Sequence, residues 1–389
     1  MIPLKEAIKI LNEIPVFPRE EEIPLEEAAG RILAEDVVSP IDMPPFHKSA
    51  MDGYAVNSLD ESECFKVIEV IPAGCVPKKT VGPGQCAKIM TGGMLPEGAD
   101  RVIRREVTVE KDGVMRLTGD DTEQNVCFKG EDIKTGDRVL ERVTLLRPQE
   151  VAVAASVGKE ILKVYRKPVV GIAATGSEIV KPGFPLKKGQ IYDSNTYSLG
   201  AQLKQMGVPL KKTIRIADSP SDIKTTISGL LEACDLVLIS GGVSMGDYDY
   251  VPGILKELGA WLHFKKVAIK PGKPTVFGSK DNTIVFGVPG NPVSTFVIFE
   301  IFIKPFIYRM MGYEFKPLII KGKLKRELRR KKSTRTAFYP VYFSEGEVEL
   351  PSYHGSAHIL ALTRANGLIR MPAGQNFIPE GALIDVRPV

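Results

Sequence analysis

The sequence predicts a multidomain protein of the α/β plus β class, with a doubly wound α/β domain, a helical N-terminal domain interrupted by a β-rich insertion, and a C-terminal β domain. Helix and strand patterns alternate between residues 167 and 311, which is typical of a parallel sheet covered by helices. Short Val/Ile-rich runs divided by Gly and Pro fill residues 39–130 and 312–389, as in β domains. A chain of 389 residues is also longer than one core supports.

Helical patterns on both sides of the insertion predict the N-terminal domain, assigned to residues 1–38 and 131–166. Apolar residues recur at helical spacing over residues 4–14, directly behind Pro3. Pro24 similarly precedes a second predicted helix, from Leu25 to about Glu35, and a third is expected over residues 148–156. Because helices flank residues 39–130, that β-rich region is expected to be inserted into a helical domain.

The α/β domain and the C-terminal domain follow from the same periodicities. In the α/β domain, strands are expected at 168–174, 210–216, 235–240, 261–269 and 285–288, and helices at 195–206, 221–233, 251–258 and 292–309. In the C-terminal domain, strands are expected at 337–343, 368–371 and 383–386. The continuous apolar run over 235–240 indicates a strand covered on both faces.

Composition excludes several functional classes. No apolar stretch reaches the roughly 20 residues of a membrane span, and the N-terminus reads as an amphipathic helix, so a cytoplasmic protein without membrane contact is expected. Five cysteines with no C-x-x-C pair favour neither a zinc site nor a disulfide framework. His354 and His358 fall in strand and turn context without a partnering ligand, which also disfavours zinc. Residues 321–335 hold nine Lys or Arg and one Glu, but the run lacks interleaved aromatics. It is interpreted as a solvated face, with anion steering as the alternative, rather than as a nucleic-acid site.

The stretch after the buried strand 235–240 is a glycine loop followed by a helix start. Glycines at 241, 242 and 246 let the backbone approach an anion closely, and the following helix adds the positive end of its dipole. Asp247 and Asp249 would repel an anionic ligand unless a divalent cation lay between them. The pair therefore suggests Mg²⁺ bridging to phosphate oxygens.

Other loops should meet this one, because ligands of doubly wound sheets bind at the carboxyl ends of the strands. Thr175 and Glu178 follow the first strand, and Asp218 follows another, where it either faces the crevice or caps the next helix. Two further ligand loops are predicted around Lys266, Lys270 and Lys273, and around Pro289, Gly290, Asn291 and Ser294. In the β insertion, Asp52 and Thr91 lie in glycine-containing loops. Taken alone, the Asp52 loop reads as a common surface turn, and the Thr91 loop as either a hairpin or a ligand loop.

Six motifs in order resemble the molybdopterin molybdenumtransferase family, known as MoeA, and the E domain of gephyrin. They are PPFHKSAMDGYAV within residues 43–56, IMTGGMLPEGAD at 89–100, residues 175–178 with Asp193-Ser194-Asn195, SGGVSMGDYDY at 240–250, KVAIKPGKP at 266–274 and GVPGNPVS at 287–294. The resemblance implies a molybdopterin-binding α/β domain at 167–311. It also implies an elongated homodimer of four-domain subunits, whose cleft lies between the α/β domain of one subunit and the β insertion of the other.

The activity implied is the last step of molybdenum cofactor synthesis, in which adenylylated molybdopterin and molybdate give molybdenum-loaded molybdopterin and AMP, assisted by Mg²⁺. By this resemblance the catalytic residues are Asp249, Asp247, Asp52, Glu178 and Asp218. The metal ligands are Asp247, Asp249 and Glu178. The cofactor-binding residues are Thr91, Thr175, Ser240, Gly241, Gly242, Ser244, Lys266, Lys270, Lys273, Pro289, Gly290, Asn291, Ser294, Arg335 and Ser356.

Several alternatives stay open at the level of the sequence. A tungstate-specific version of the enzyme would have the same residues, since the two oxyanions are alike in size and charge. A scaffold without turnover, as in gephyrin, would not need the acidic and lysine positions, and a lone adenylyltransferase would lack the flanking β domains. His47 and Gly92-Gly93-Met94 depart from commoner family versions without removing a catalytic residue. Contact with a molybdopterin adenylyltransferase that hands over the substrate is a further expected partnership.

Overall fold

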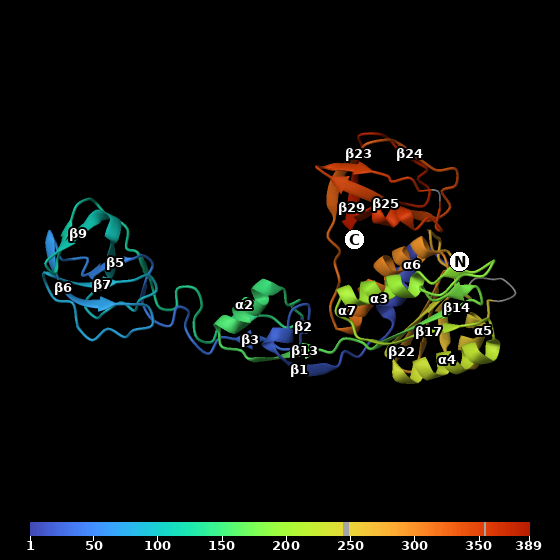
Figure 1. Cartoon of the computed structure of the whole chain (residues 1–389), viewed down its shortest axis with the longest axis horizontal. Coiled ribbons are helices and arrows are strands. Elements are labelled where there is room, and N and C mark those ends of the chain that lie inside the picture. Colours follow the sequence, from blue (N-terminus) through green and yellow to red (C-terminus); the bar gives the residue numbers. More distant parts are fainter. Residues whose placement is uncertain (244–248, 354) are drawn as a thin grey trace. The chain divides into compact units, whose positions relative to one another are not determined.

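The structure is a computed structural model that describes residues 1–243, 249–353 and 355–389 (Figure 1). The chain separates into two compact units. Unit 1 comprises Met1–Glu21, Gly30–Ile32 and Val164–Val389, and unit 2 comprises Glu22–Ala29 and Leu33–Lys163. Among the described residues, no helix is both long and apolar enough to cross a bilayer.

The N-terminal region is less helical than predicted. The helices α1 (Leu4–Glu13) and α2 (Pro148–Ser156) are confirmed, but the second predicted helix is wrong. Only a single 3₁₀ turn forms at Leu25–Glu27, because Gly30 adopts a positive φ of 74° and the chain then enters strand β2 (Ile32–Leu33). That strand joins a sheet of order β1-β13-β2, with β1 at Glu20–Pro24 and β13 at Ile161–Tyr165. A helical N-terminal domain is therefore not confirmed.

Unit 2 contains the expected β-rich region. Its main sheet has the order β8-β5-β7-β6-β10-β9, with β5 at Gly53–Val56, β6 at Cys64–Ile71, β7 at Gln85–Ile89, β8 at Arg101–Arg104, β9 at Thr108–Lys111 and β10 at Val114–Leu117. Strands β8 and β9 are separated by a 3₁₀ turn at Arg105–Val107. Two small ladders also belong to the unit: β3 (Val37–Val38) with β12 (Arg138–Leu140), and β4 (Lys48–Ser49) with β11 (Val126–Cys127).

The α/β part of unit 1 has a mixed sheet of order β17-β14-β18-β22-β21-β19. Its strands are β14 (Val170–Thr175), β17 (Leu210–Ile216), β18 (Leu236–Ser240), β19 (Trp261–Phe264), β21 (Val276–Lys280) and β22 (Thr283–Val288). The first four strands of that order are parallel, as predicted, but β21 runs antiparallel to both of its neighbours, β22 and β19. The reversal follows from a two-residue turn at 281–282, where Asp281 has a φ of 50°, since such a turn closes a hairpin.

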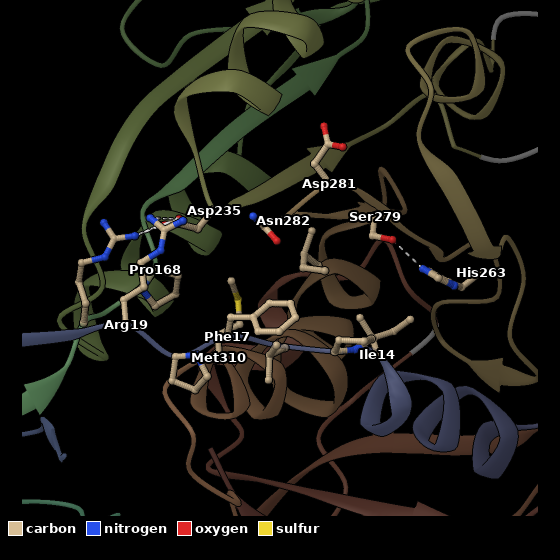
Figure 2. Close-up of a pocket in the computed structure, with 15 residues that line it drawn as sticks. Ile14, Phe17, Arg19, Pro168, Asp235, His263, Ser279, Asp281, Asn282 and Met310 are labelled. Carbon is tan, nitrogen blue, oxygen red and sulfur yellow. Dashed lines mark hydrogen bonds and ion pairs between the residues drawn. The ribbon is translucent and has the colours of Figure 1, made fainter. Parts of the chain in front are cut away.

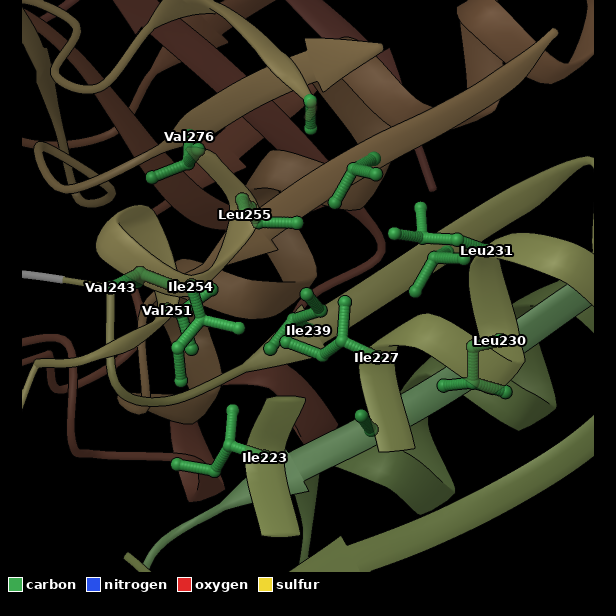
Figure 3. Close-up of a cluster of buried hydrophobic side chains, with 14 of the residues drawn as sticks. Ile223, Ile227, Leu230, Leu231, Ile239, Val243, Val251, Ile254, Leu255 and Val276 are labelled. Carbon is green, nitrogen blue, oxygen red and sulfur yellow. The ribbon is translucent and has the colours of Figure 1, made fainter. Parts of the chain in front are cut away.

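Helices cover both faces of this sheet. They are α3 (Asn195–Gln205), α4 (Pro220–Ala233), α5 (Val251–Glu257), α6 (Pro292–Ile298) and α7 (Lys304–Met310), with a π-helical segment at Phe299–Ile303 between the last two. Figure 1 shows α4 and α5 on one face and α3, α6 and α7 on the other. Beneath α4 and α5, Ile223, Ile227, Ile239 and Leu255 are at most 1% exposed and pack into one apolar cluster (Figure 3). This core fixes the carboxyl ends of β14 and β18, which carry the predicted site loops.

The C-terminal part of unit 1 is a closed barrel. The strand order is β20-β25-β26-β23-β29-β27, and an additional β25–β27 pairing closes the ring. Its strands are β23 (Ile320–Leu324), β25 (Thr336–Ser344), β26 (Glu347–Glu349), β27 (Gly367–Met371) and β29 (Leu383–Pro388), beside a small β24 (Leu328–Arg329) and β28 (Phe377–Ile378) ladder and a short α8 (Leu360–Thr363). Strand β20 (Ile269–Lys270) joins this barrel by pairing with β25, so the single strand predicted at 261–269 is wrong.

The basic run of residues 321–335 lies on strands and turns of this barrel. Lys321 pairs with Asp385 at 2.5 Å, and Lys325 pairs with Glu347 at 3.0 Å. These side chains are about half exposed. The lysine charges are therefore stabilised both by water and by the paired carboxylates. The pairings favour a solvated face for the run.

Candidate functional site

A cavity of about 770 Å³ lies where the parallel strands β14, β18 and β22 end. Its described lining comes mainly from the loops that follow those strands and from the segment that leads into α3, with Asp218 from the loop after β17 and further residues at Pro274, Ala357 and Ile359. The predicted site residues that line it are Thr175, Glu178, Asp218, Ser240, Gly241, Gly242, Asp249, Pro289, Gly290 and Asn291. Ser244 and Asp247 lie outside the described residues. The sheet therefore brings together loops that are far apart in sequence, as expected for a doubly wound domain.

The glycine loop has a backbone that other residues would not tolerate. Gly241 and Gly242 have φ values of 89° and 62°. A Cβ at Gly241 would lie 2.4 Å from the backbone oxygen of Thr175, and one at Gly242 would lie 2.7 Å from Thr175 Oγ1. The Thr175 backbone thus excludes a Cβ at Gly241, and the Thr175 side chain excludes one at Gly242. The glycine loop therefore packs closely against the end of β14. Thr175 is buried, and its Oγ1 has no hydrogen-bond partner in the described part of the chain.

Asn195, which was not among the predicted site residues, connects two of these loops. Its Nδ2 donates to Ser240 Oγ at 2.8 Å and to the carbonyl oxygen of Gly290 at 2.7 Å. Asn195 is the first residue of α3, is buried, and lines the cavity. Its place in the Asp193-Ser194-Asn195 motif was the available sequence signal. The contacts themselves depend on how α3 packs against the sheet.

A second side-chain pair that the sequence did not reveal lies next to Asn195. Asp193 lines the cavity, with a side chain only 1% exposed, and Arg215 Nε donates to its Oδ2 at 2.7 Å. The same oxygen accepts from Thr196 Oγ1, and Oδ1 accepts from the Thr196 amide at 3.0 Å. These donors hold the turn into α3 and so fix the start of the helix that carries Asn195.

Three carboxylates, those of Glu178, Asp218 and Asp249, line the same cavity. Asp218 is held by Ser177: the Ser177 amide donates to Asp218 Oδ2 at 3.0 Å, and the Asp218 amide donates to Ser177 Oγ at 3.0 Å. The N-cap of α4 is Ser219, whose side chain accepts from the Asp222 amide at 3.4 Å. The alternative interpretation of Asp218 as that helix cap is therefore wrong.

The carboxylates fit a Mg²⁺ ion that is shared with a ligand. Among the described residues, no group of three or more His, Cys, Asp or Glu side chains could hold a metal by itself. Mg²⁺ typically keeps several waters and takes one or two carboxylates plus substrate phosphates, which does not require such a group. A Cβ on Gly176 would lie 2.5 Å from Glu178 Oε2, so this glycine leaves room for the Glu178 carboxylate beside the loop. Glu178 and Asp249 are the described residues that would hold the ion.

The remaining predicted residues of unit 1 do not line this cavity. Lys270 and Lys273 are exposed and Lys266 is half-buried, around strand β20 of the barrel. Ser294 is buried in α6. Ser356 accepts from Asn291 Nδ2 at 3.0 Å, so it adjoins a cavity residue. Arg335 Nη1 donates to the carbonyl oxygen of Ile269 at 3.3 Å.

Asp52 and Thr91 are brought together in unit 2. Both the amide and the Oγ1 of Thr91 donate to Asp52 Oδ1, each at 2.7 Å. These bonds, the amide first, lower the pKa of the Asp52 carboxyl below its ordinary value. The two loops that were predicted separately therefore form one anchored acidic position.

A second cavity, of about 710 Å³, lies at the opposite end of the α/β sheet (Figure 2). Its lining includes Pro168 and Asp235, which precede β14 and β18. Arg166 Nη2 bonds both oxygens of Asp235, at 2.8 and 3.0 Å, and His263 Nε2 lies 2.9 Å from Ser279 Oγ. These polar groups satisfy one another, and the cavity lies at the amino ends of the strands. The functional assignment therefore stays with the cavity at the carboxyl ends.

Comparisons with known proteins agree with this geometry. Three family models match: the MoeA N-terminal region (domain I and II) over residues 2–158, a probable molybdopterin binding domain over 171–309, and the MoeA C-terminal region (domain IV) over 321–389. The molybdopterin molybdenumtransferase of Staphylococcus aureus (strain Mu50 / ATCC 700699) is 36% identical, covering 99% of this chain and 95% of the relative. That of Staphylococcus epidermidis (strain ATCC 12228 / FDA PCI 1200) is 35% identical with the same coverage.

Solved structures give the same result. The crystal structure of the molybdopterin biosynthesis MoeA protein from Pyrococcus horikoshii OT3 has a TM-score of 0.85 and 31% identity, covering all of both chains. A second Pyrococcus MoeA structure has a TM-score of 0.82 and 33% identity, covering all of this chain and 99% of the other. The chain therefore belongs to the MoeA family of molybdopterin molybdenumtransferases, which are transferases of molybdenum cofactor biosynthesis.

Proposed function

We propose that this protein inserts molybdate into adenylylated molybdopterin and releases AMP, and that the cavity at the ends of β14, β18 and β22 is where this occurs. The observation that carries the proposal is the meeting of the glycine loop, the Pro289–Asn291 loop and three carboxylates at one cavity of about 770 Å³. The substrate is a diphosphate whose P–O–P linkage breaks when AMP leaves. Such a site must therefore bind anions and manage developing negative charge.

The residues divide this task by their chemistry. The tight backbone at Gly241 and Gly242, together with the hydroxyls of Thr175 and Ser240, offers donors to phosphate or molybdate oxygens. Glu178 and Asp249 would hold Mg²⁺, which when bound neutralises phosphate charge during cleavage. Asp218, fixed by Ser177, supplies a third carboxylate at the cavity. Positioning and electrostatics are expected to supply most of the rate enhancement.

We further propose that the protein is a homodimer in which Asp52 and Thr91 of one subunit complete the site of the other. The support is the anchored Asp52 carboxylate, together with the family resemblance. Reduced cysteines would suit a cytoplasmic location, and all five are free in the structure.

The proposed domain boundaries remain 1–38 with 131–166, 39–130, 167–311 and 312–389.

The first test measures AMP release from adenylylated molybdopterin with Mg²⁺, with and without molybdate, for the native chain and Asp249→Asn. Release that requires molybdate and is lost in the variant is the expected result. Tight substrate binding without release by either protein would reject turnover and leave a gephyrin-like binding role. Replacing molybdate by tungstate in the same assay compares the two oxyanions.

A complementation experiment tests the shared site. Asp52→Asn and Asp249→Asn chains are each expected to be inactive alone. If each site uses Asp249 of one subunit and Asp52 of the other, mixed dimers contain one intact site and recover part of the native activity. Mixing that restores no activity, although mixed dimers form, would show that both residues must act from the same chain. Each variant mixed with itself is the control.

A further inference from the structure

The side-chain amide of Asn195 donates both of its N–H groups to hydrogen bonds. They bond Ser240 Oγ, at the end of β18, and the carbonyl oxygen of Gly290, in the loop between β22 and α6. A side-chain amide has two donors on its nitrogen, so this pairing fixes which way the amide faces. One buried side chain thus connects two of the loops that line the cavity.

The hydrogen bond from Asn195 limits where the Ser240 hydroxyl can direct its proton. Because its oxygen accepts from Asn195, the hydroxyl proton must point away from that amide. No acceptor for this proton is found within residues 1–243, 249–353 and 355–389, and Ser240 is buried and lines the cavity. A buried donor without an acceptor is a group that a bound anion can satisfy.

The other end of the amide argues against a purely structural role. Asn195 Oδ1 is buried and has no partner in the part of the chain that is described. An unpaired buried acceptor destabilises the folded state and so offsets part of what the two donated hydrogen bonds contribute to stability. An amide at this position is therefore better explained by what it does to Ser240 and Gly290 than by what it adds to stability.

We propose that Asn195 is a positioning residue of the ligand cavity. It directs the Ser240 hydroxyl toward an anionic oxygen of the ligand, phosphate or molybdate, and holds the Gly290 loop at a fixed distance from the glycine loop. The inference rests on the proposed function for the identity of the ligand, but the positioning itself applies to any oxyanion bound there.

The test compares Asn195→Leu with Gln202→Leu in the full-length protein. Gln202 is a matched control on the same helix: it is buried, its Oε1 also lacks a partner among the described residues, and it does not line the cavity. For Asn195→Leu we expect a KM for adenylylated molybdopterin raised roughly ten- to hundredfold, the size of one hydrogen bond to a charged group, while circular dichroism shows a native fold. Gln202→Leu should leave KM unchanged.

Two further variants test whether Asn195 acts through the Ser240 hydroxyl. Asn195→Asp keeps the size, but its carboxylate accepts the Ser240 proton instead of donating to the oxygen, so it should raise KM as well. The double variant Ser240→Ala with Asn195→Leu should have a KM no higher than that of the single variant that binds substrate more weakly. The reason is that both substitutions remove the same hydrogen-bond donor. Additive effects, or a native KM in Asn195→Leu and Asn195→Asp, would overturn the inference.

AMP binding, measured by calorimetry, separates failure of the inference from failure of the proposed function. If the native chain binds AMP but shows no molybdate-dependent release, the proposed function fails. Weaker AMP binding by Asn195→Leu, with Gln202→Leu unchanged, would still support the positioning role. Equal AMP affinity in all three proteins would overturn that role whether or not release is observed.

Discussion

Asp52 Oδ1 accepts two hydrogen bonds from Thr91, one from the amide and one from the hydroxyl, and both are 2.7 Å long. The pair joins the loop before β5 to the loop after β7. Because two donors face one oxygen, the ionised carboxylate is favoured and the pKa of Asp52 is lowered. Asp52 is thereby held as an oriented negative charge at neutral pH.

The first prediction concerns Thr91→Val, which keeps the amide donor and removes the hydroxyl. The pKa of Asp52 should rise toward its ordinary value, as an NMR titration of the carboxyl group would show. A carboxyl whose folded pKa is lowered stabilises the protein fully above its unfolded pKa, about 4, and this contribution is lost as the pH falls through the folded pKa. Thr91→Val should therefore be less stable than the native chain at pH 7, with the difference shrinking below about pH 4.

Thr122→Val is a suitable control for that prediction, because Thr122 is exposed and its side chain makes no hydrogen bond with the described residues. It should leave both the pKa of Asp52 and the stability unchanged. A stability difference for Thr91→Val that is the same at pH 7 and at roughly pH 2 would mean that packing, not the Asp52 charge, causes it.

The second prediction concerns Gly241→Ala. With a φ of 89° and a Cβ only 2.4 Å from the Thr175 carbonyl oxygen, alanine forces the loop to move. We expect a loss of about 1–3 kcal/mol in stability and a loss of ligand binding. Denaturation and AMP binding measure the two effects. Native AMP affinity in this variant would show that the loop backbone does not contact the ligand.

Gly229→Ala serves as the matched control. Gly229 lies within α4, and a Cβ there would have no atom within 4 Å. Alanine should therefore stabilise the helix by about 0.5–1 kcal/mol, with AMP release unchanged.

The third prediction is that Asp218→Asn lowers kcat for AMP release by at least about tenfold, equivalent to about 1.4 kcal/mol. An amide oxygen at this position can still accept from the Ser177 amide, so the loop should keep its shape while the charge is lost. Circular dichroism and the melting temperature check the fold, and single-turnover kinetics measure the chemical step. Native kcat would show that Asp218 only organises the loop.

Much of the α/β domain was predictable because its strands are buried runs that end in glycine loops. The run 235–240 forms β18 at the centre of the sheet, and its loop reaches the cavity as expected. The antiparallel strand β21 was missed because its apolar residues adjoin those of β22 across only two turn residues. Asp281-Asn282 is the signal that could have revealed this hairpin.

The site was predictable only as far as strand order places residues together. Loops at the carboxyl ends of parallel strands must meet, so Thr175, Ser240 and Gly290 could be grouped from sequence. Asn195 could not be assigned its partners in this way, since its contacts depend on how α3 packs. The helix predicted after Pro24 was wrong because its amphipathic spacing suggested a helix where none forms. Gly30 instead ends the turn, and Ile32 enters a buried strand.

The last prediction concerns Glu300, in the π-helical segment. This glutamate is 4% exposed and accepts from Lys304 Nζ at 3.1 Å and Gln202 Nε2 at 3.2 Å, and Arg387 of the barrel strand β29 lies 3.6 Å away. Burial lowers the pKa of Arg387, which indicates that its cation is costly without a counter-charge. Glu300→Gln leaves two cations there uncompensated and should cost about 3–5 kcal/mol in the free energy of unfolding.

Glu314→Gln is the matched control, because Glu314 pairs with Lys316 at 3.4 Å while both side chains are at least 80% exposed. The same change of charge at the surface should cost no more than about 1 kcal/mol. Urea denaturation followed by circular dichroism compares the two variants. If Glu300→Gln lowers the free energy of unfolding no more than Glu314→Gln, then water or a shift of Arg387 compensates the lost charge. The ion pairs of Glu300 would then not stabilise the attachment of β29 to the helix that carries Glu300.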